Sequence, residues 1–206
     1  MSRDSAVDTA LNRLDDLLAK AKTAGAEDAD AVMVDSVSIS HAQRPGQVEH
    51  LERSEEAEVG LRVLIGPRQA CVASSDLTQA AMDELVERAV AMASSVPEDP
   101  YCGLAPASML AKDWPNLDSD DPREPSAETL IERARACEEA ARAVDGITNS
   151  EGAEASWGRY NIALAGTNGF RGGYTNSSHG VGCAVLAGEG TGMERDYAFH
   201  SAVYGG

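Results

Sequence analysis

The sequence is poor in aromatic residues, and this shortage decides what kind of core the chain can build. Phe, Trp and Tyr make up 4% of the 206 residues, whereas hydrophobic residues as a whole make up 43%. A hydrophobic core can form from that share, but small side chains such as alanine must fill most of it. The length suits one large domain or two small ones.

Cysteines and long hydrophobic runs are also scarce. The four cysteines are far apart and form no CxxC motif, which excludes a zinc ribbon and a thioredoxin-like motif. Cys137 lies in the apolar stripe of an expected helix, so we interpret it as a small core residue. No run of about 18 apolar residues occurs, and the first residues lack the apolar core of a signal peptide. We therefore expect a cytoplasmic chain with reduced thiols and no membrane partner.

Basic residues are outnumbered two to one. The 34 Asp and Glu against 17 Lys and Arg give a formal net charge of −17. Because phosphate backbones are bound through Lys and Arg, this balance argues against nucleic acid as a direct partner. Many acids fall on the outer faces of expected helices and in the loop DSDDPREP, residues 118–125, where we interpret them as solvated.

Three amphipathic helices are predicted from apolar residues spaced three and four apart. The first begins near Val7. The second follows Thr78, whose hydroxyl suits the N-cap, and Leu77 and Met82 have the spacing of a hydrophobic staple. In the third helix, Pro125 is expected near the first position.

Alternating hydrophobicity predicts two groups of antiparallel strands. Four strands are expected before the second helix, with turns at RPGQ and GPRQ: DADAVMVDSVSIS, VEHLER, AEVGLRVLIG and ACVASS. Four more are expected after the third helix, with turns at TNG, SSHG and GEGTG: NIALAG, GFRGGYTNSS, VGCAVLAGE and RDYAFHSAV.

This order of elements predicts an α+β fold in which helices pack on antiparallel β meanders. The two helix-plus-meander units are candidates for a structural duplication. We expect them to span about residues 1–96 and 124–206, joined by a Pro-rich loop over 97–123. Three apolar residues in this loop indicate that it is held down: Leu104, Met109 and Trp114.

No catalytic motif is recognisable from the residues alone. The sequence has no GxxxxGK[ST], HExxH, HExxxH or GxSxG, and GTNGFRGG lies between strands rather than before a helix. No two histidines are paired at helical spacing: His41 and His50 fall in the first meander, His179 in an expected turn and His200 in a strand. A metal site assembled from His179, His200 and Glu194 stays open as the weaker alternative.

The densest group of reactive side chains is Glu194, Arg195, Asp196 and Tyr197, in the segment GMERDYA. One interpretation is acid–base chemistry. The interpretation we favour is a strand with alternating faces, in which a cross-strand salt bridge satisfies the charges. These four residues are therefore candidates for peptide binding or assembly, and no residue is predicted to be catalytic or to bind a metal.

Three segments resemble the N-terminal half of the TldD/PmbA family, whose members carry the old label of modulators of DNA gyrase. They are VEHLERSEEAEVGLRVLIGPRQACVASSDL, ITNSEGAEASWGRYNIALAGTNGFRGGYTNSSHG and GMERDYA. The order of ITNSEG and GMERDYA is the most specific feature, and it is similar to the PmbA (TldE) branch. The resemblance runs from about Ala6 to the end. Because family members are roughly twice as long, we expect residues 1–206 to be an N-terminal domain, from a truncated reading frame or an excised segment, without its C-terminal domain.

The resemblance implies a non-catalytic subunit of a cytoplasmic TldD–TldE heterodimeric metallopeptidase that acts on unfolded peptides. In such a pair the TldD-like partner carries HExxxH and holds the metal, with zinc expected, while this chain holds no cofactor. A missing C-terminal half would leave Ala202–Tyr204 unpaired, which predicts self-association. The alternative is a modulator of DNA gyrase that binds protein and has no role in proteolysis.

Overall fold

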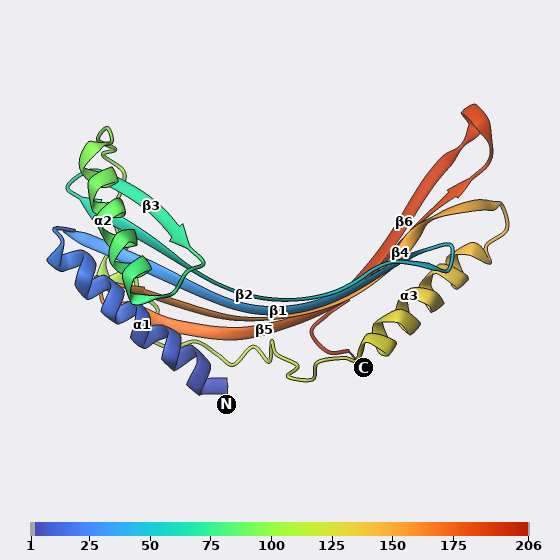
Figure 1. The fold of residues 1–206 in the computed structure, drawn as a ribbon, viewed down its shortest axis with the longest axis horizontal. Coiled ribbons are helices and arrows are strands. Elements are labelled where there is room, and N and C mark those ends of the chain that lie inside the picture. Colours follow the sequence, from blue (N-terminus) through green and yellow to red (C-terminus); the bar gives the residue numbers. More distant parts are fainter. Residues whose placement is uncertain (1–2, 206) are drawn as a thin grey trace. The chain divides into compact units, whose positions relative to one another are not determined.

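The computed structural model describes residues 3–205, and its six strands form a sheet in the order β3-β2-β1-β4-β5-β6 (Figure 1). The elements follow one another as α1 (Arg3–Thr23), β1 (Asp28–Arg44), β2 (Gln47–Ile65), β3 (Arg68–Ser74), α2 (Gln79–Ser95), η1 (Ala107–Met109), α3 (Ala127–Arg142), β4 (Ile147–Gly166), β5 (Arg171–Ala187), η2 (Gly190–Gly192) and β6 (Glu194–Ala202). The predicted α+β class with antiparallel pairing is confirmed. None of the described helices is long and apolar enough to cross a membrane.

The strands are fewer and longer than predicted. The segments VEHLER and AEVGLRVLIG form one strand, β2, and β5 runs through the SSHG segment that was expected to turn. The turns at RPGQ, GPRQ and TNG are confirmed, and each has a glycine with positive φ: 70° at Gly46, 54° at Gly66 and 93° at Gly169. Only glycine adopts that conformation without a steric penalty, whereas SSHG contains no residue with positive φ.

The chain divides into two compact units, each of which is described by itself. One comprises the chain up to Asp35, Glu56–Leu117 and Tyr160–Thr175; the other comprises Ser36–Glu55, Asp118–Arg159 and the chain from Asn176 onward. The division into 1–96 and 124–206 made from the sequence remains a prediction.

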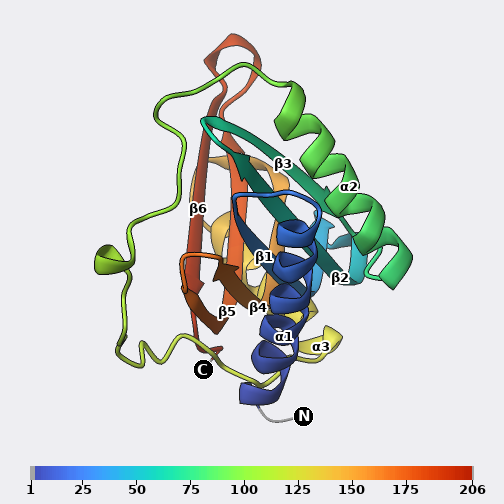
Figure 2. The ribbon, with the colours of Figure 1, turned by 90° about the vertical axis from the view of Figure 1, so that its left-hand side faces the viewer.

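In the first unit, α1 and α2 lie side by side against the strands (Figure 2). Half of the buried residues in this core are alanines, as the shortage of aromatic residues predicted. The helix start at Thr78 is confirmed, since its side chain accepts a hydrogen bond from the Ala81 amide, and both Leu77 and Met82 pack against the core.

In the second unit, α3 covers one face of the strands around the buried Trp157. Leu130 and Ala134 of α3 are fully buried there, and Cys137 packs against the same cluster. Ser126 is the N-cap of α3, so Pro125 lies immediately before the helix, near the predicted position.

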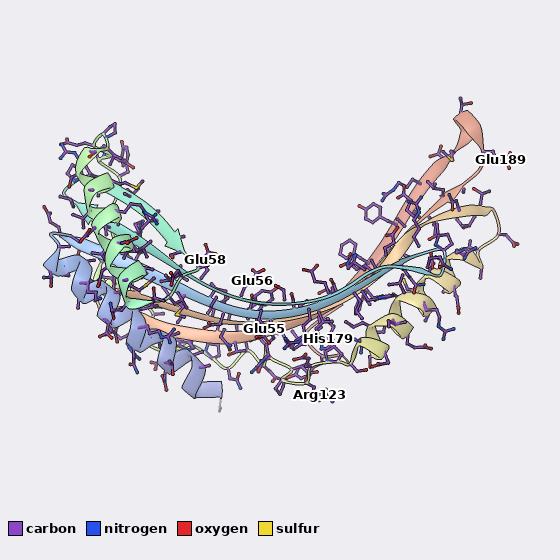
Figure 3. The ribbon with its side chains drawn as sticks, in the orientation of Figure 1. Glu55, Glu56, Glu58, Arg123, His179 and Glu189 are labelled. Atoms are coloured by element: carbon purple, nitrogen blue, oxygen red, sulfur yellow. The ribbon has the colours of Figure 1, made fainter. Side chains whose placement is uncertain are left out.

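The first half of β2 lies outside the β3 ladder, which pairs only Val59–Ile65 of β2 with β3. This stretch, Gln47–Glu58, is mostly exposed and carries five glutamates. Glu55, Glu56 and Glu58 are labelled in Figure 3. Charged side chains along an open strand oppose the addition of another strand.

Candidate functional site

The predicted site residues Glu194, Arg195, Asp196 and Tyr197 all lie on β6, the last strand of the sheet. β6 pairs with β5 in an antiparallel register that places Glu194 opposite Ala187 and Ala198 opposite Cys183. Among residues 3–205 no strand pairs with the other edge of β6, and Glu194–Ser201 are exposed. The backbone groups along that edge are therefore open to a partner.

Alternation along β6 sorts the site residues onto two faces. Arg195, Tyr197 and Phe199 share one face, where the Tyr197 and Phe199 rings stack with centroids 6.5 Å apart and an interplanar angle of 7°. Tyr197 is 63% exposed and Phe199 is 78% exposed. Two adjacent aromatic rings without a covering layer are unusual on a protein surface and mark a candidate contact site.

The face that carries these rings is hollowed into a groove of about 600 Å³. Its lining comes from all five strands of the second unit: Ala42, Gln43, Glu49, His50, Glu151, Gly152, Ala153, Glu154, Ser156, Gly180, Val181, Gly182, Cys183, Arg195, Tyr197, Ala198, Phe199, His200 and Ser201. Two glycines line the groove at points where a larger residue would be crowded. A Cβ on Gly180 would lie 2.8 Å from the Ser156 hydroxyl oxygen, and one on Gly182 would lie 3.2 Å from the Phe199 Cβ.

Arg195 is engaged within the groove. Its Nε donates to Glu151 Oε2 at 2.5 Å, and its guanidinium carbon lies 5.5 Å from the centre of the Tyr197 ring. The salt bridge between strands that we favoured for this segment is present, with its acid on β4. The pair holds the Arg195 side chain against the aromatic face.

A second group of polar residues surrounds the segment that follows β6. Ser177 donates to the Val203 carbonyl, Arg133 donates to the Gly205 carbonyl, and the Gly205 amide donates to Asp121. Ala202 and Val203 are half-buried and Tyr204 is 42% exposed, so the backbone of this segment is anchored while part of its apolar surface stays exposed. A Cβ on Gly205 would lie 2.5 Å from the His179 ring, so only glycine fits there.

His179 and Asp121 face each other in this second group, with His179 Nε2 3.7 Å from Asp121 Oδ2 (Figure 3 labels His179 and Arg123). Burial lowers the pKa of His179, the nearby Arg133 and Arg123 lower it further, and Asp121 opposes them. The bidentate hydrogen bonds from Arg123 hold the pKa of Asp121 well below its ordinary value. His179 lies within β5 and is only 8% exposed, so its expected place in a turn is wrong.

Two acids of the DSDDPREP loop are buried rather than solvated. Asp120 accepts two hydrogen bonds from Arg159, at 2.7 and 3.1 Å, and Asp121 is bound by Arg123. These ion pairs fix the end of the loop. Of the apolar residues expected to hold the loop down, Leu104 is half-buried and Trp114 makes a tilted contact with Phe170, whereas Met109 is exposed. Composition could not reveal this, because the arginine that binds Asp120 is far away in the sequence.

Sequence reasoning also missed Glu138, a buried carboxylate on α3. It accepts hydrogen bonds from Gln43, the Gly46 amide and Ser150, which lower its pKa although burial acts to raise it. The one available signal was an acid next to Cys137 on the apolar side of the helix.

Within residues 3–205 no three His, Cys, Asp or Glu side chains come together in a way that could hold an ion. The alternative site is not formed either, because the β5–β6 register places Glu194 opposite Ala187 and His179 opposite Ala202, at opposite ends of the hairpin. His50 and His200 line the groove, whereas His41 is fully buried.

The described residues thus form an α+β scaffold with an exposed aromatic edge strand. Two family models place it more closely: the PmbA/TldA metallopeptidase domain 1 matches residues 29–93, and the PmbA/TldA metallopeptidase central domain matches residues 120–204. Together they cover more than half of the chain. The chain therefore belongs to the TldD/PmbA family.

Curated relatives agree with this assignment. The chain is 35% identical over 198 residues to Metalloprotease PmbA of Escherichia coli O157:H7, covering 95% of this chain and 42% of the relative. It is 28% identical over 170 residues to the Metalloprotease PmbA homolog of Haemophilus influenzae, covering 82% of this chain and 38% of that protein. The chain thus spans less than half the length of these relatives.

Solved structures share the fold. A candidate modulator of DNA gyrase from Bacteroides thetaiotaomicron superposes with a TM-score of 0.85 at 20% identity, covering 94% of this chain and 45% of that chain. TldE from Thermococcus kodakarensis superposes with a TM-score of 0.75 at 14% identity, covering 93% of this chain and 43% of that chain.

Proposed function

We propose that this chain is the N-terminal half of a PmbA-type subunit that has no catalytic metal of its own. It assembles in the cytoplasm with a TldD-type metallopeptidase subunit, which carries the metal, with zinc expected, and hydrolyses unfolded peptides. The open edge of β6 beside the exposed Tyr197 and Phe199 rings is the observation that carries this proposal. An extended peptide, or a strand of the partner subunit, can pair with such an edge without a particular sequence.

Reconstitution tests the proposal. The chain is mixed with a TldD-type subunit from the same genome, and complex formation is followed by sedimentation velocity while hydrolysis of an unfolded, fluorescently labelled protein is measured. We expect one complex containing both chains and hydrolysis that depends on the metal of the TldD-type subunit. Absence of a complex, together with hydrolysis that is the same with and without this chain, would contradict the proposal.

A role in modulating DNA gyrase is the competing hypothesis, and the fold it shares with the Bacteroides protein is its support. The net charge of −17 implies that such a role would act through protein contacts rather than DNA. A supercoiling assay with purified gyrase and this chain, without any peptidase, distinguishes the two. A change in supercoiling that depends on the dose of the chain would favour the gyrase role.

A further inference from the structure

The side chain of Arg195 shows how a cation is held in the groove. Its Nε donates to Glu151 Oε2 on β4, and its guanidinium carbon lies 5.5 Å from the centre of the Tyr197 ring on β6. Because β5 lies between β4 and β6 in the sheet, this ion pair spans β5. A carboxylate from one side and an aromatic ring from the other thus hold one cation on the face of the sheet.

The same kinds of residue recur further along these three strands. Phe199 on β6 is directly opposite Gly182 on β5. A Cβ on Gly180 would lie 2.8 Å from the Ser156 hydroxyl oxygen, so Gly180 on β5 and Ser156 on β4 are neighbours on the groove face. Since β4 and β5 are consecutive neighbours joined by a short turn, they run antiparallel, and Glu154 therefore lies beside Gly182. A carboxylate, a glycine and a ring form a row across β4, β5 and β6.

This second row has no cation from the described part of the chain. Glu154 is exposed and makes no hydrogen bond or ion pair with any residue of the range 3–205. Arg195 is the only arginine or lysine among the described lining residues, and it is matched by Glu151. Phe199 is 78% exposed, and Gly182 adds no side chain between the ring and the carboxylate.

The chemistry of this space favours an arginine side chain. A guanidinium is planar, so one face can lie against a ring while its edge donates hydrogen bonds to a carboxylate. Neighbouring strands are about 4.8 Å apart, so the backbones at Glu154 and Phe199 are separated by about 10 Å, which leaves room for one such group between the two side chains. An anionic side chain in the same place would be repelled by Glu154.

We propose that the space over Gly182, between Glu154 and Phe199, binds the guanidinium of an arginine in an unfolded peptide that lies in the groove. The inference rests on the proposed function, since it names the side chain that the subunit takes from such a peptide. The ligand lies on the face of the sheet rather than along the edge of β6, because only a group over β5 reaches both the carboxylate and the ring. The β6 edge stays open to a strand of the partner subunit.

An NMR titration of the chain alone, labelled with ¹⁵N, measures both the affinity and the place of binding. Short peptides rich in glycine and serine carry one central residue, which is arginine, citrulline or glutamate. Citrulline keeps the shape of arginine without its charge. Glycine and serine form strands poorly, so the peptides have little tendency to pair with the edge of β6. A salt concentration of about 0.15 M screens the general attraction between a basic peptide and an acidic protein.

We expect the arginine peptide to bind about tenfold more tightly than the citrulline peptide and to shift the amide signals of Gly182 and Phe199. Glu154→Gln should reduce this preference about threefold, because the carboxylate is lost. Phe199→Leu keeps an apolar side chain without a ring and should also reduce it about threefold. Glu87→Gln, the same change on an exposed acid of α2, is the matched control and should leave binding unchanged.

Equal binding of the arginine and citrulline peptides would overturn the inference, and so would the same loss in Glu87→Gln and Glu154→Gln. Displacement of the arginine peptide by the TldD-type subunit alone would also overturn it, because the partner subunit would then be the occupant. Melting curves of all variants separate loss of binding from loss of folding. If the peptides fail here while the reconstituted pair still hydrolyses protein, only the arginine site is wrong and the proposed function stands.

Discussion

Glu138 shows how a single buried charge can organise the second unit. Its carboxylate accepts hydrogen bonds from Gln43 Nε2 at 2.8 Å, the Gly46 amide at 3.0 Å and the Ser150 hydroxyl at 2.7 Å. It thereby joins α3 to β1, to the β1–β2 turn and to β4. A buried charge with several hydrogen bonds is tolerated, whereas removing it leaves several buried donors without acceptors.

Replacing Glu138 should therefore cost much more stability than replacing its exposed neighbour. We expect Glu138→Ala to lower the free energy of unfolding by about 3 kcal/mol, because the buried Gln43 and Ser150 side chains lose their acceptor. Glu139→Ala, which removes only an exposed pair with Arg135, should cost less than about 0.5 kcal/mol. Urea unfolding followed by circular dichroism measures both; similar losses in the two variants would contradict this assignment.

His179 should make stability depend on pH. Its pKa lies below the ordinary value because it is buried and faces Arg133 and Arg123, with Asp121 opposing them. The unfolded chain then takes up the proton more readily, so this stabilisation is complete above about pH 6.5 and is lost as the pH falls toward the folded-state pKa. We expect the melting temperature of the wild type to fall between pH 7 and pH 5, and His179→Asn to fall less.

His200→Asn, a change of an exposed histidine on β6, is the control for this experiment. It should follow the wild-type curve over the whole pH range. A His179→Asn protein with the same pH dependence as the wild type would assign the effect to another group.

Cys137 should react slowly with alkylating reagents. Burial and a hydrogen bond with Cys183 raise the pKa of its thiol to about 11, so roughly a thousandth of it is thiolate at pH 8. Cys71 is exposed on β3 and should be alkylated first. Timed reaction with iodoacetamide followed by peptide mass spectrometry gives the order, and rapid labelling of Cys137 in the folded chain would contradict it.

At the scale of elements, local signals predicted the helices and the glycine turns well. Thr78 begins a helix because its hydroxyl caps a free amide three residues on, and such a contact is visible in the sequence. The length of β2 and β5 was not predictable in this way, because a strand continues as long as its neighbours pair with it. The continuation of β5 through Ser177 and His179 therefore depends on long-range strand pairing and on burial.

The site was only partly predictable for the same reason. The alternation of Arg195 and Tyr197 on one face followed from the period of a strand. The partner of Arg195, however, is Glu151, which is distant in the sequence. Buried ion pairs such as Asp120 with Arg159 could not be predicted from the sequence either, because composition gives the number of charges but not which of them lie opposite each other.

β6 also supports a prediction about assembly. If the open edge of β6 holds the partner subunit or its peptide, Arg195→Ala should weaken complex formation or peptide capture severalfold, because it frees the Glu151 charge and the face of Tyr197. Glu194→Ala should act in the same direction but less, since Glu194 is at the end of the strand. The metal content of the complex should not change. Unchanged activity of the reconstituted pair with both variants would remove these residues from the site.

At the scale of the whole molecule, the acidic balance and the open edge act on self-association in opposite ways. A net charge of −17 keeps copies apart at low salt, whereas exposed rings such as Phe199 attract one another. We expect the chain to be mostly monomeric at low salt and to form dimers as salt is raised. Sedimentation velocity at two salt concentrations measures this, with Phe199→Ser as the control that stays monomeric. A dimer favoured by low salt would contradict it.

The glutamate-rich half of β2 limits how far any such association can go. A fibril grows only when each copy can accept a neighbour on both sides. The other edge of the described sheet is formed by β3 and, beyond the reach of β3, by the glutamate-rich stretch Gln47–Glu58 of β2. The like charges along that stretch oppose strand pairing, so two copies that meet through β6 leave a second edge that accepts a neighbour poorly.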